Sequence, residues 1–196
     1  DFKYVGGRGP ISITDVLRYS SNVGMVHIMD TLQRSTYYEW LEKLGLGGKT
    51  GIELPGEVSG QIKNRDQFVN SAVEAATTAF GQGFSLTPLQ LVQLHGALAN
   101  GGNLVTPHVV RGMVNSEGEL TWTPHAQTEP ERVFSTETTQ QVLSMMQEVV
   151  DDGTGAAAKV DGYQIAGKTG TAQKATEYGT YGDQRITSFV SIAPVS

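Results

Sequence analysis

Apolar side chains recur every three or four residues through much of the first 153 positions, which is the spacing of helices that bury one face. The pattern predicts helices over residues 11–17, 22–32, 36–44, 69–80, 88–98 and 136–150. Ser12 or Thr14 is the expected N-cap of the first helix. The helix from residue 88 has the clearest start, because Thr87 occupies the N-cap position, Pro88 follows it, and Gln90 completes a capping box.

Within the predicted helix over 69–80, Val69, Val73, Ala76 and Phe80 have the spacing of a buried face. Residues 45–68 and 103–133 are instead rich in turn-forming residues. These two stretches are expected to be loops, the second of them with short strands.

After Gly153 the apolar period changes from that of helices to that of strands. Strands are predicted over 162–173 and 185–194, joined through 177–183 as a long hairpin, with Tyr163 and Ile165 in the core. The second strand has β-branched and aromatic residues on both faces, which is typical of a central strand covered on both sides. An isolated hairpin is marginal in water, so the other strands of the sheet are expected outside this sequence.

The composition narrows the possible functions. The 196 residues carry a net charge of −6 with 14 basic residues and no basic run, which argues against a nucleic-acid surface. The absence of cysteine excludes disulfides, thiolate metal sites and a cysteine nucleophile. The histidines have no metal-ligand spacing, and no cofactor is expected; they are His27, His95, His108 and His125. The abrupt ends of the sequence, and the lack of a membrane-spanning stretch or signal peptide, suggest a piece of a longer protein.

Two short motifs carry the candidate chemistry. In the predicted strand, Lys168 and Gly170 alternate with Thr169 and Thr171, so a cation, hydroxyls and closely approachable backbone lie together. This combination suits an anionic, peptide-like ligand at a sheet edge. The second motif, Ser20-Ser21-Asn22, stands where a helix begins, and alone it equally fits a helix cap.

In this order, S-x-N at a helix start and K-T-G on a later strand resemble the penicillin-recognising serine enzymes. The similarity is to class B penicillin-binding proteins and spans nearly the whole chain. It rests on residues 20–24, 50–60, 79–83, 86–91 and 167–173. It implies an α+β fold with helices packed around an antiparallel sheet. Residues 1–196 would form part of one transpeptidase domain, with a helical portion over about 11–153.

The resemblance also implies an activity and roles for residues. Family members are D,D-transpeptidases that cross-link peptidoglycan stem peptides and are acylated by β-lactams. By this resemblance Ser20 shuttles a proton to the leaving amine, Asn22 bonds the substrate amide, and Lys168 supplies positive charge. The hydroxyls of Thr169 and Thr171 would bind the terminal carboxylate, with the Thr171 N–H in the oxyanion hole. Gly170 and Gln82 complete the implied substrate-binding set.

One family element is missing. No serine in the sequence has a lysine three residues later, the S-x-x-K motif that supplies the nucleophile; Ser59 and Lys63 are four apart. The chain alone is therefore expected to be inactive, with the nucleophile upstream. A catalytically silent homologue or a β-lactam sensor domain stays an alternative. A class A or D β-lactamase is less favoured, because the long loop and helix region over 45–134 fits the penicillin-binding proteins better.

A P-loop nucleotide-binding protein is a further alternative, since residues 162–169 match G-x-x-x-x-G-K-T. A P-loop requires an apolar strand before the first glycine and a helix after the threonine. Residues 156–161 lack a strand pattern and Gly170 follows Thr169 directly, so the match is expected to be a coincidence.

Family membership further implies an extracytoplasmic position at the cell membrane, held by an N-terminal anchor. Other membrane proteins of cell-wall synthesis are the implied protein partners. The Lys168-Thr169-Gly170 form of the motif and the Pro55-Gly56-Glu57 loop favour the division-associated branch.

Overall fold

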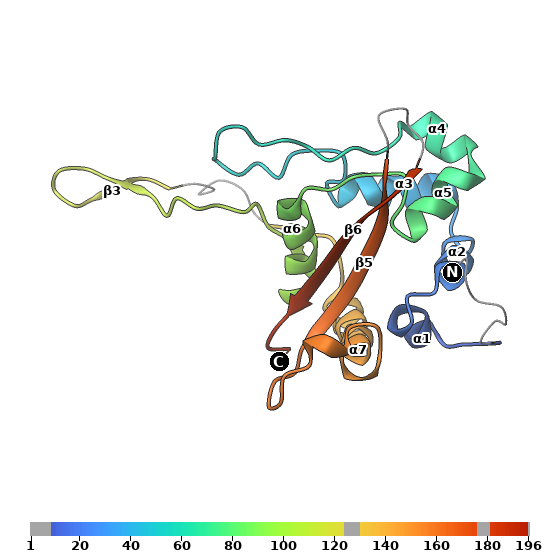
Figure 1. Ribbon diagram of the computed structural model, residues 1–196. Helices are drawn as coiled ribbons and strands as arrows, with labels where there is room; N and C mark the ends of the chain where they lie inside the picture. The colour runs from blue at the N-terminus through green and yellow to red at the C-terminus, as the bar shows by residue number, and fades with distance from the viewer. Residues whose placement is uncertain (1–8, 124–129, 176–180, 196) are drawn as a thin grey trace.

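The computed structural model describes residues 9–123, 130–175 and 181–195 (Figure 1). Its helices are α1 (Ile13–Arg18), α2 (Asn22–Met29), α3 (Arg34–Lys43), α4 (Arg65–Asn70), α5 (Ala72–Ala79), α6 (Pro88–Ala99), α7 (Thr136–Asp152) and the 3-10 turn η1 (Ala156–Ala158). Its strands are β1 (Asn103–Leu104), β2 (Met113–Val114), β3 (Leu120–Trp122), β4 (Glu131–Arg132), β5 (Ala166–Ala175) and β6 (Tyr181–Ile192). His125 and most of the predicted 177–183 connection lie outside the described residues.

Side-chain caps fix where the helices begin. Ser12, and not Thr14, caps α1, with Asp15 completing a capping box. The predicted box of α6 is confirmed, since the N–H of Gln90 donates to the Thr87 hydroxyl and the N–H of Thr87 donates to the Gln90 side chain. Each bond satisfies a backbone N–H that the first turn of a helix leaves unpaired.

Gln90 also joins α6 to two loops. Its Oε1 accepts from the N–H of Gly60 at 3.1 Å, and its Nε2 donates to the carbonyls of Gly45 at 3.2 Å and Gly48 at 2.9 Å. The side chain is only 3% exposed, so these bonds are shielded from water. The loops around residues 45–60 are therefore anchored to the start of α6.

The predicted single helix over 69–80 is wrong. The backbone is extended at Ser71 (φ −114°, ψ 112°), and its hydroxyl caps α5 by accepting from the N–H of Glu74 at 3.2 Å. The break rotates the buried face, so Ala75 and Thr78 are buried while Val73 is 70% exposed. Serine accounts for this break, because its side chain bonds the backbone of a helix start more readily than that of a helix interior.

The helical part has its own core around Phe68. Helices α2, α3, α4 and α5 contribute to this core. The rings of Tyr37 and Tyr38 lie 5.5 and 5.3 Å from the ring of Phe68, and the Tyr38 hydroxyl donates to the Lys63 carbonyl at 3.0 Å. The buried members are Met29, Tyr38, Leu41, Leu46, Phe68 and Ala75.

Strands β5 and β6 form the predicted antiparallel hairpin, with Lys168 opposite Val190 and Gly170 opposite Ser188. The first strand begins at Ala166, later than predicted. A turn with Gly162 in the left-handed region (φ 84°) precedes it, and Tyr163 is 66% exposed. The prediction that Tyr163 is a core residue is therefore wrong.

The hairpin lies on the long helix α7, and α6 packs against β6 (Figure 1). A Cβ on Gly167 would lie 2.6 Å from the ring of Phe189 and 3.1 Å from the side chain of Val150. A Cβ on Gly170 would lie 2.5 Å from the Ser188 hydroxyl. These glycines leave room for the protein's own side chains, where the sequence had suggested the backbone of a ligand.

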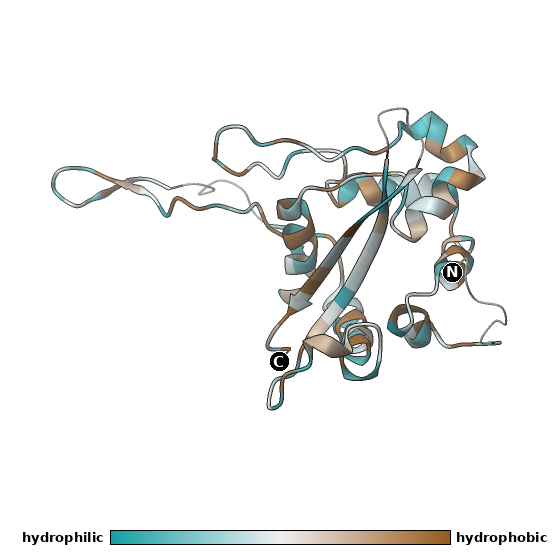
Figure 2. Ribbon diagram, in the orientation of Figure 1, coloured by the Kyte–Doolittle hydropathy of each residue, from teal (hydrophilic) through white to brown (hydrophobic). Residues whose placement is uncertain are grey.

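Figure 2 shows the C-terminal half of β6 as hydrophobic, whereas β5 is mostly neutral. Ile186 and Phe189 are exposed, and within the described residues β6 pairs with β5 alone. The prediction that β6 is a central, covered strand stays a prediction. No helix in the described ranges is long and apolar enough to cross a bilayer.

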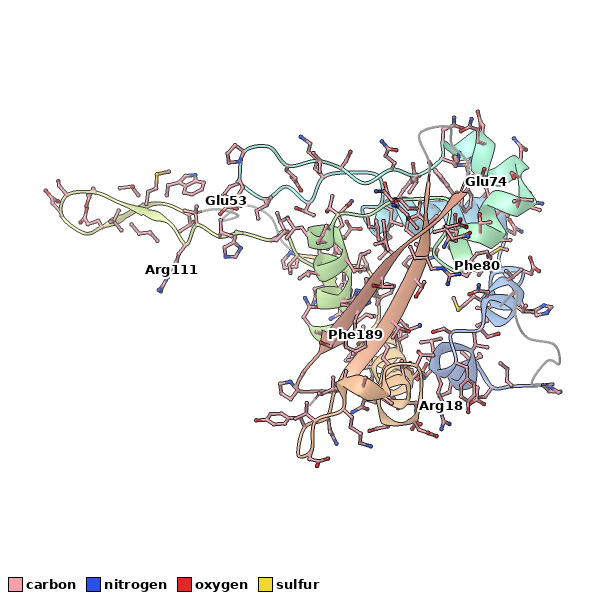
Figure 3. All side chains as sticks on the ribbon, in the orientation of Figure 1. Arg18, Glu53, Glu74, Phe80, Arg111 and Phe189 are labelled. Atoms are coloured by element: carbon pink, nitrogen blue, oxygen red, sulfur yellow. The ribbon has the colours of Figure 1, made fainter. Side chains whose placement is uncertain are left out.

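Two loops extend away from the helical core on one side of the molecule (Figure 1). One covers residues 45–62, and the other carries the β2–β3 hairpin. Glu53 links them, since its Oε1 accepts from the N–H of Val109 at 2.8 Å and of Val110 at 2.5 Å (Figure 3). The predicted irregular stretch with short strands is thus confirmed, and it is held by a carboxylate.

Candidate active site

Ser20 lies in the short turn between α1 and α2. Its φ of 52° is the one positive φ at a non-glycine residue in the described part of the chain. The N–H groups of Ser20 and Ser21 donate back to the carbonyls of Leu17 and Val16, which closes the turn. A left-handed serine costs conformational energy, so the bonds of the surrounding turn must hold it.

The helix-cap role belongs to Ser21. Its hydroxyl accepts from the N–H of Gly24 at 3.1 Å and starts α2 at Asn22. The hydroxyl of Ser20 is therefore not used for capping and faces β5. The interpretation of this tripeptide as a helix cap is therefore right for Ser21. The hydroxyl of Ser20 is left for a chemical role.

Lys168 on β5 contacts Ser20. Its Nζ donates to the Ser20 Oγ and also to the Thr169 carbonyl, the latter at 2.9 Å. Burial of the ammonium group lowers the pKa of Lys168 from its ordinary value, because the charged form loses part of its hydration. No carboxylate among the described residues forms an ion pair with it.

A further hydroxyl, which the sequence did not indicate, lies between the two motifs. Thr154 Oγ1 is 3.4 Å from Ser20 Oγ and 2.9 Å from Thr169 Oγ1. Thr154 follows the end of α7, outside any periodic segment, and so no pattern in the sequence points to it. Thr154, in the turn after α7, thus joins the S-x-N and K-T-G motifs through its hydroxyl.

Arg18 holds the main chain on both sides of this contact. Its Nε donates to the Asp152 carbonyl at 2.9 Å, and its guanidinium pairs with the Asp152 carboxylate. Its own carbonyl accepts from the N–H of Thr154 at 3.1 Å. Figure 3 shows Arg18 where α1 and α7 face each other. The ends of these two helices, which precede Ser20 and Thr154, are therefore tied together.

The other predicted site residues are less closely connected. Asn22 is the half-buried first residue of α2, and its side chain has no hydrogen-bond partner in the described ranges. Thr171 is exposed on β5 opposite Thr187, and Gly170 lies opposite Ser188. The structure therefore brings Ser20, Lys168 and Thr169 together.

Gln82 lies in the turn after α5, where its N–H donates to the Thr77 carbonyl at 2.9 Å. Among the described residues no hydrogen bond or ion pair joins it to Ser20 or Lys168. Its predicted part in substrate binding stays a prediction.

The backbone around Lys168 is that of a strand. β5 runs unbroken through Thr169 and Gly170, with no helix after Thr169. This contradicts a P-loop, in which a helix N-terminus must face the phosphates. A metal-binding group of three or more His, Cys, Asp or Glu side chains is not found in the described ranges. What the site offers is one cation and several hydroxyls, which suits an anionic organic group.

Comparisons with known proteins identify the family of the chain. The family model described as penicillin binding protein transpeptidase domain matches residues 1–196. A peptidoglycan D,D-transpeptidase FtsI homolog of Mesostigma viride is 41% identical over 95% of this chain and 33% of its own length. The penicillin-binding protein PbpB of Mycobacterium tuberculosis is 40% identical over 84% of this chain and 25% of its own length.

Among solved structures, penicillin binding protein 3 of Mycobacterium tuberculosis complexed with ampicillin superposes with a TM-score of 0.91. It is 37% identical, and the match covers 98% of this chain and 44% of that one. The expected fold class is therefore confirmed. The chain spans a quarter to a third of the length of these two curated relatives. It belongs to the penicillin-binding protein transpeptidase domain family.

Proposed function

We propose that the protein carrying this chain is a peptidoglycan D,D-transpeptidase that is acylated by D-Ala-D-Ala stem peptides and by β-lactams. The observation that carries the proposal is the contact between Lys168 Nζ and Ser20 Oγ. A cation bonded to a hydroxyl favours the alkoxide-like character that a proton shuttle needs. The relatives named peptidoglycan D,D-transpeptidase support the same reaction.

In the proposed acylation, the nucleophile is a serine of an S-x-x-K motif elsewhere in the protein, since residues 1–196 contain none. Its oxygen adds to the carbonyl carbon of the D-Ala-D-Ala amide. As the ester forms and the C–N bond breaks, Ser20 passes the serine's proton to the leaving amine nitrogen. The amine of a second stem peptide then attacks the ester carbonyl; the new amide bond forms as the ester C–O bond breaks, and the proton lost by the amine returns to the nucleophilic serine.

The strand residues have binding roles in this proposal. Thr169 and Thr171 donate their hydroxyls to the terminal carboxylate, which Lys168 attracts through its charge. The Thr171 N–H is one oxyanion donor, a kind of contact worth about 3 kcal/mol in comparable enzymes. Gly170, Asn22 and Gln82 complete the substrate-binding wall.

The proposal places residues 1–196 within a single transpeptidase domain at the extracytoplasmic face of the membrane, held by an N-terminal anchor. Stem peptides and β-lactams are the proposed ligands. A class B, division-type protein agrees with relatives named FtsI homolog and PbpB. Other membrane proteins of cell-wall synthesis are the proposed partners.

Covalent labelling tests this function directly. The full-length protein is incubated with a fluorescent penicillin and separated under denaturing conditions, with one sample first saturated with unlabelled benzylpenicillin. A covalent band that the unlabelled drug suppresses is expected. No covalent band from the folded protein would favour a catalytically silent homologue.

A further inference from the structure

Four polar groups form a continuous chain beside β5, a strand that pairs with β6 alone in the described part of the protein. Lys168 Nζ donates to Ser20 Oγ, which lies 3.4 Å from Thr154 Oγ1, and Thr154 Oγ1 lies 2.9 Å from Thr169 Oγ1. The groups come from the turn after α1, the residue after Gly153 and two neighbouring positions of β5. Thr154 is the only link between the Ser20 and Thr169 hydroxyls within the described residues.

The first member of this chain fixes one hydrogen-bond direction. An ammonium group only donates, so the Ser20 oxygen must accept from Lys168. Accepting from a cation makes the Ser20 hydroxyl a stronger donor, and its hydrogen is repelled away from the charge toward Thr154. With Ser20 as the donor to Thr154, Thr154 donates in turn to Thr169. The Thr169 hydrogen is left without an acceptor in the described part of the protein, and it can donate to a ligand.

Within the described residues, the Thr154 hydroxyl makes no hydrogen bond besides these two. Its main chain is fixed separately, because its N–H donates to the Arg18 carbonyl at 3.1 Å and Arg18 is clamped to Asp152. The residue is exposed, so its side chain is not packed in a core. Loss of its hydroxyl would therefore break the chain of hydrogen bonds while the backbone stays held.

We propose that Thr154 is a positioning residue that directs the Thr169 hydroxyl hydrogen toward the carboxylate of the bound peptide or β-lactam. The inference rests on the proposed function. Thr154 does not touch the reacting atoms, and it acts through Thr169. Its effect is expected only for ligands that present an anionic carboxylate, since a neutral group gains far less from an aligned hydroxyl.

The test compares benzylpenicillin with its neutral methyl ester as acylating probes of the full-length protein. The second-order acylation rate constant of each probe is measured by competition with a fluorescent penicillin. Thr154→Val is expected to lower the constant for benzylpenicillin about tenfold, the scale of one charge-assisted hydrogen bond, and that for the ester less than about twofold. Thr154→Ser keeps the hydroxyl and is expected to stay within about twofold of wild type for both probes.

Thr121→Val is the matched control, because Thr121 is an exposed threonine in the distant β2–β3 hairpin whose hydroxyl also makes one hydrogen bond. It is expected to change neither constant. An equal loss for both probes in Thr154→Val, or no loss for either, would overturn the inference while the proposed function stands. A wild-type protein that benzylpenicillin does not acylate would overturn both.

Discussion

Lys168 and Ser20 are 148 positions apart in the sequence, yet the ammonium nitrogen of one donates to the hydroxyl of the other. The contact joins β5 to the turn between α1 and α2, and both β5 and α1 also pack against α7. Lys168 is half-buried at this point, where it donates to a hydroxyl and a carbonyl and, among the residues that the structure describes, forms no ion pair with a carboxylate. Several predictions about chemistry and stability depend on this arrangement.

The first concerns pH and activity. Burial lowers the pKa of Lys168 below its ordinary value of 10.5, so the residue loses its charge at a lower pH than an exposed lysine would. Acylation that depends on this charge should decline on the alkaline side at a pH below 10.5. Stopped-flow measurement of acylation against pH checks this, with spontaneous β-lactam hydrolysis subtracted. Lys168→Arg, which keeps its charge throughout this range, should show no such decline.

The same lowered pKa has a consequence for stability. Between the folded pKa of Lys168 and 10.5, the unfolded chain binds more protons than the folded one, so the free energy of unfolding rises with pH through this window. Below the folded pKa the full cost of burying the charge is present. Relative to Lys168→Met, the wild-type protein should therefore gain thermal stability as pH rises toward 10.5. A constant difference between the two proteins across this range would contradict the burial of a charged group.

The second prediction concerns Arg18. Arg18→Ala should lower the rate of acylation by a fluorescent penicillin about tenfold and the free energy of unfolding by about 1 kcal/mol, because the two helix ends that carry Ser20 and Thr154 lose their tie. Arg65→Ala is the control, since Arg65 makes an exposed ion pair with Glu39 far from this contact. An Arg18→Ala protein with the acylation rate of Arg65→Ala would show that the tie has no part in placing the site.

The third prediction concerns Gln90. Gln90→Ala removes the four hydrogen bonds of this buried side chain at once and leaves the N–H groups of Gly60 and Thr87 and the carbonyl of Gly48 without their partner. A loss of about 2–4 kcal/mol in the free energy of unfolding is expected. Gln93→Ala, on the same helix, removes one bond to the Val105 carbonyl and should cost about 1 kcal/mol. Chemical denaturation of the full-length variants gives both values, and equal losses would contradict the role of Gln90.

Much of the fold could be predicted from interactions between residues that are close in the sequence. The capping box of Thr87 and Gln90 and the start of α2 at Asn22 depend on residues within one turn of each other, so the sequence contains the whole interaction. The antiparallel hairpin likewise follows from the change of apolar period after Gly153. The predicted buried face of residues 69–80 was wrong because Ser71 caps a new helix where the prediction had one continuous helix. The spacing of apolar residues alone does not indicate such a break.

The site depended on long-range contacts that periodicity does not encode. The resemblance of two motifs to a family indicates Ser20 and Lys168, but spacing along the chain does not predict their contact. No sequence pattern predicts a role for Thr154, because it lies between a helix end and a strand, where Arg18 bonds both its N–H and the Asp152 carbonyl. Residues that act by joining distant motifs leave no local signal in a single sequence.

The measurement that tests the central claim most directly is the rate of covalent labelling of the full-length protein by a fluorescent penicillin. It is compared among the wild-type protein, Ser20→Ala and Lys168→Ala, each first shown by its melting temperature to be folded. If the Lys168–Ser20 pair transfers the proton during acylation, both variants should label about 10²- to 10⁴-fold more slowly than wild type. Labelling of either folded variant at the wild-type rate would contradict the role given to this pair.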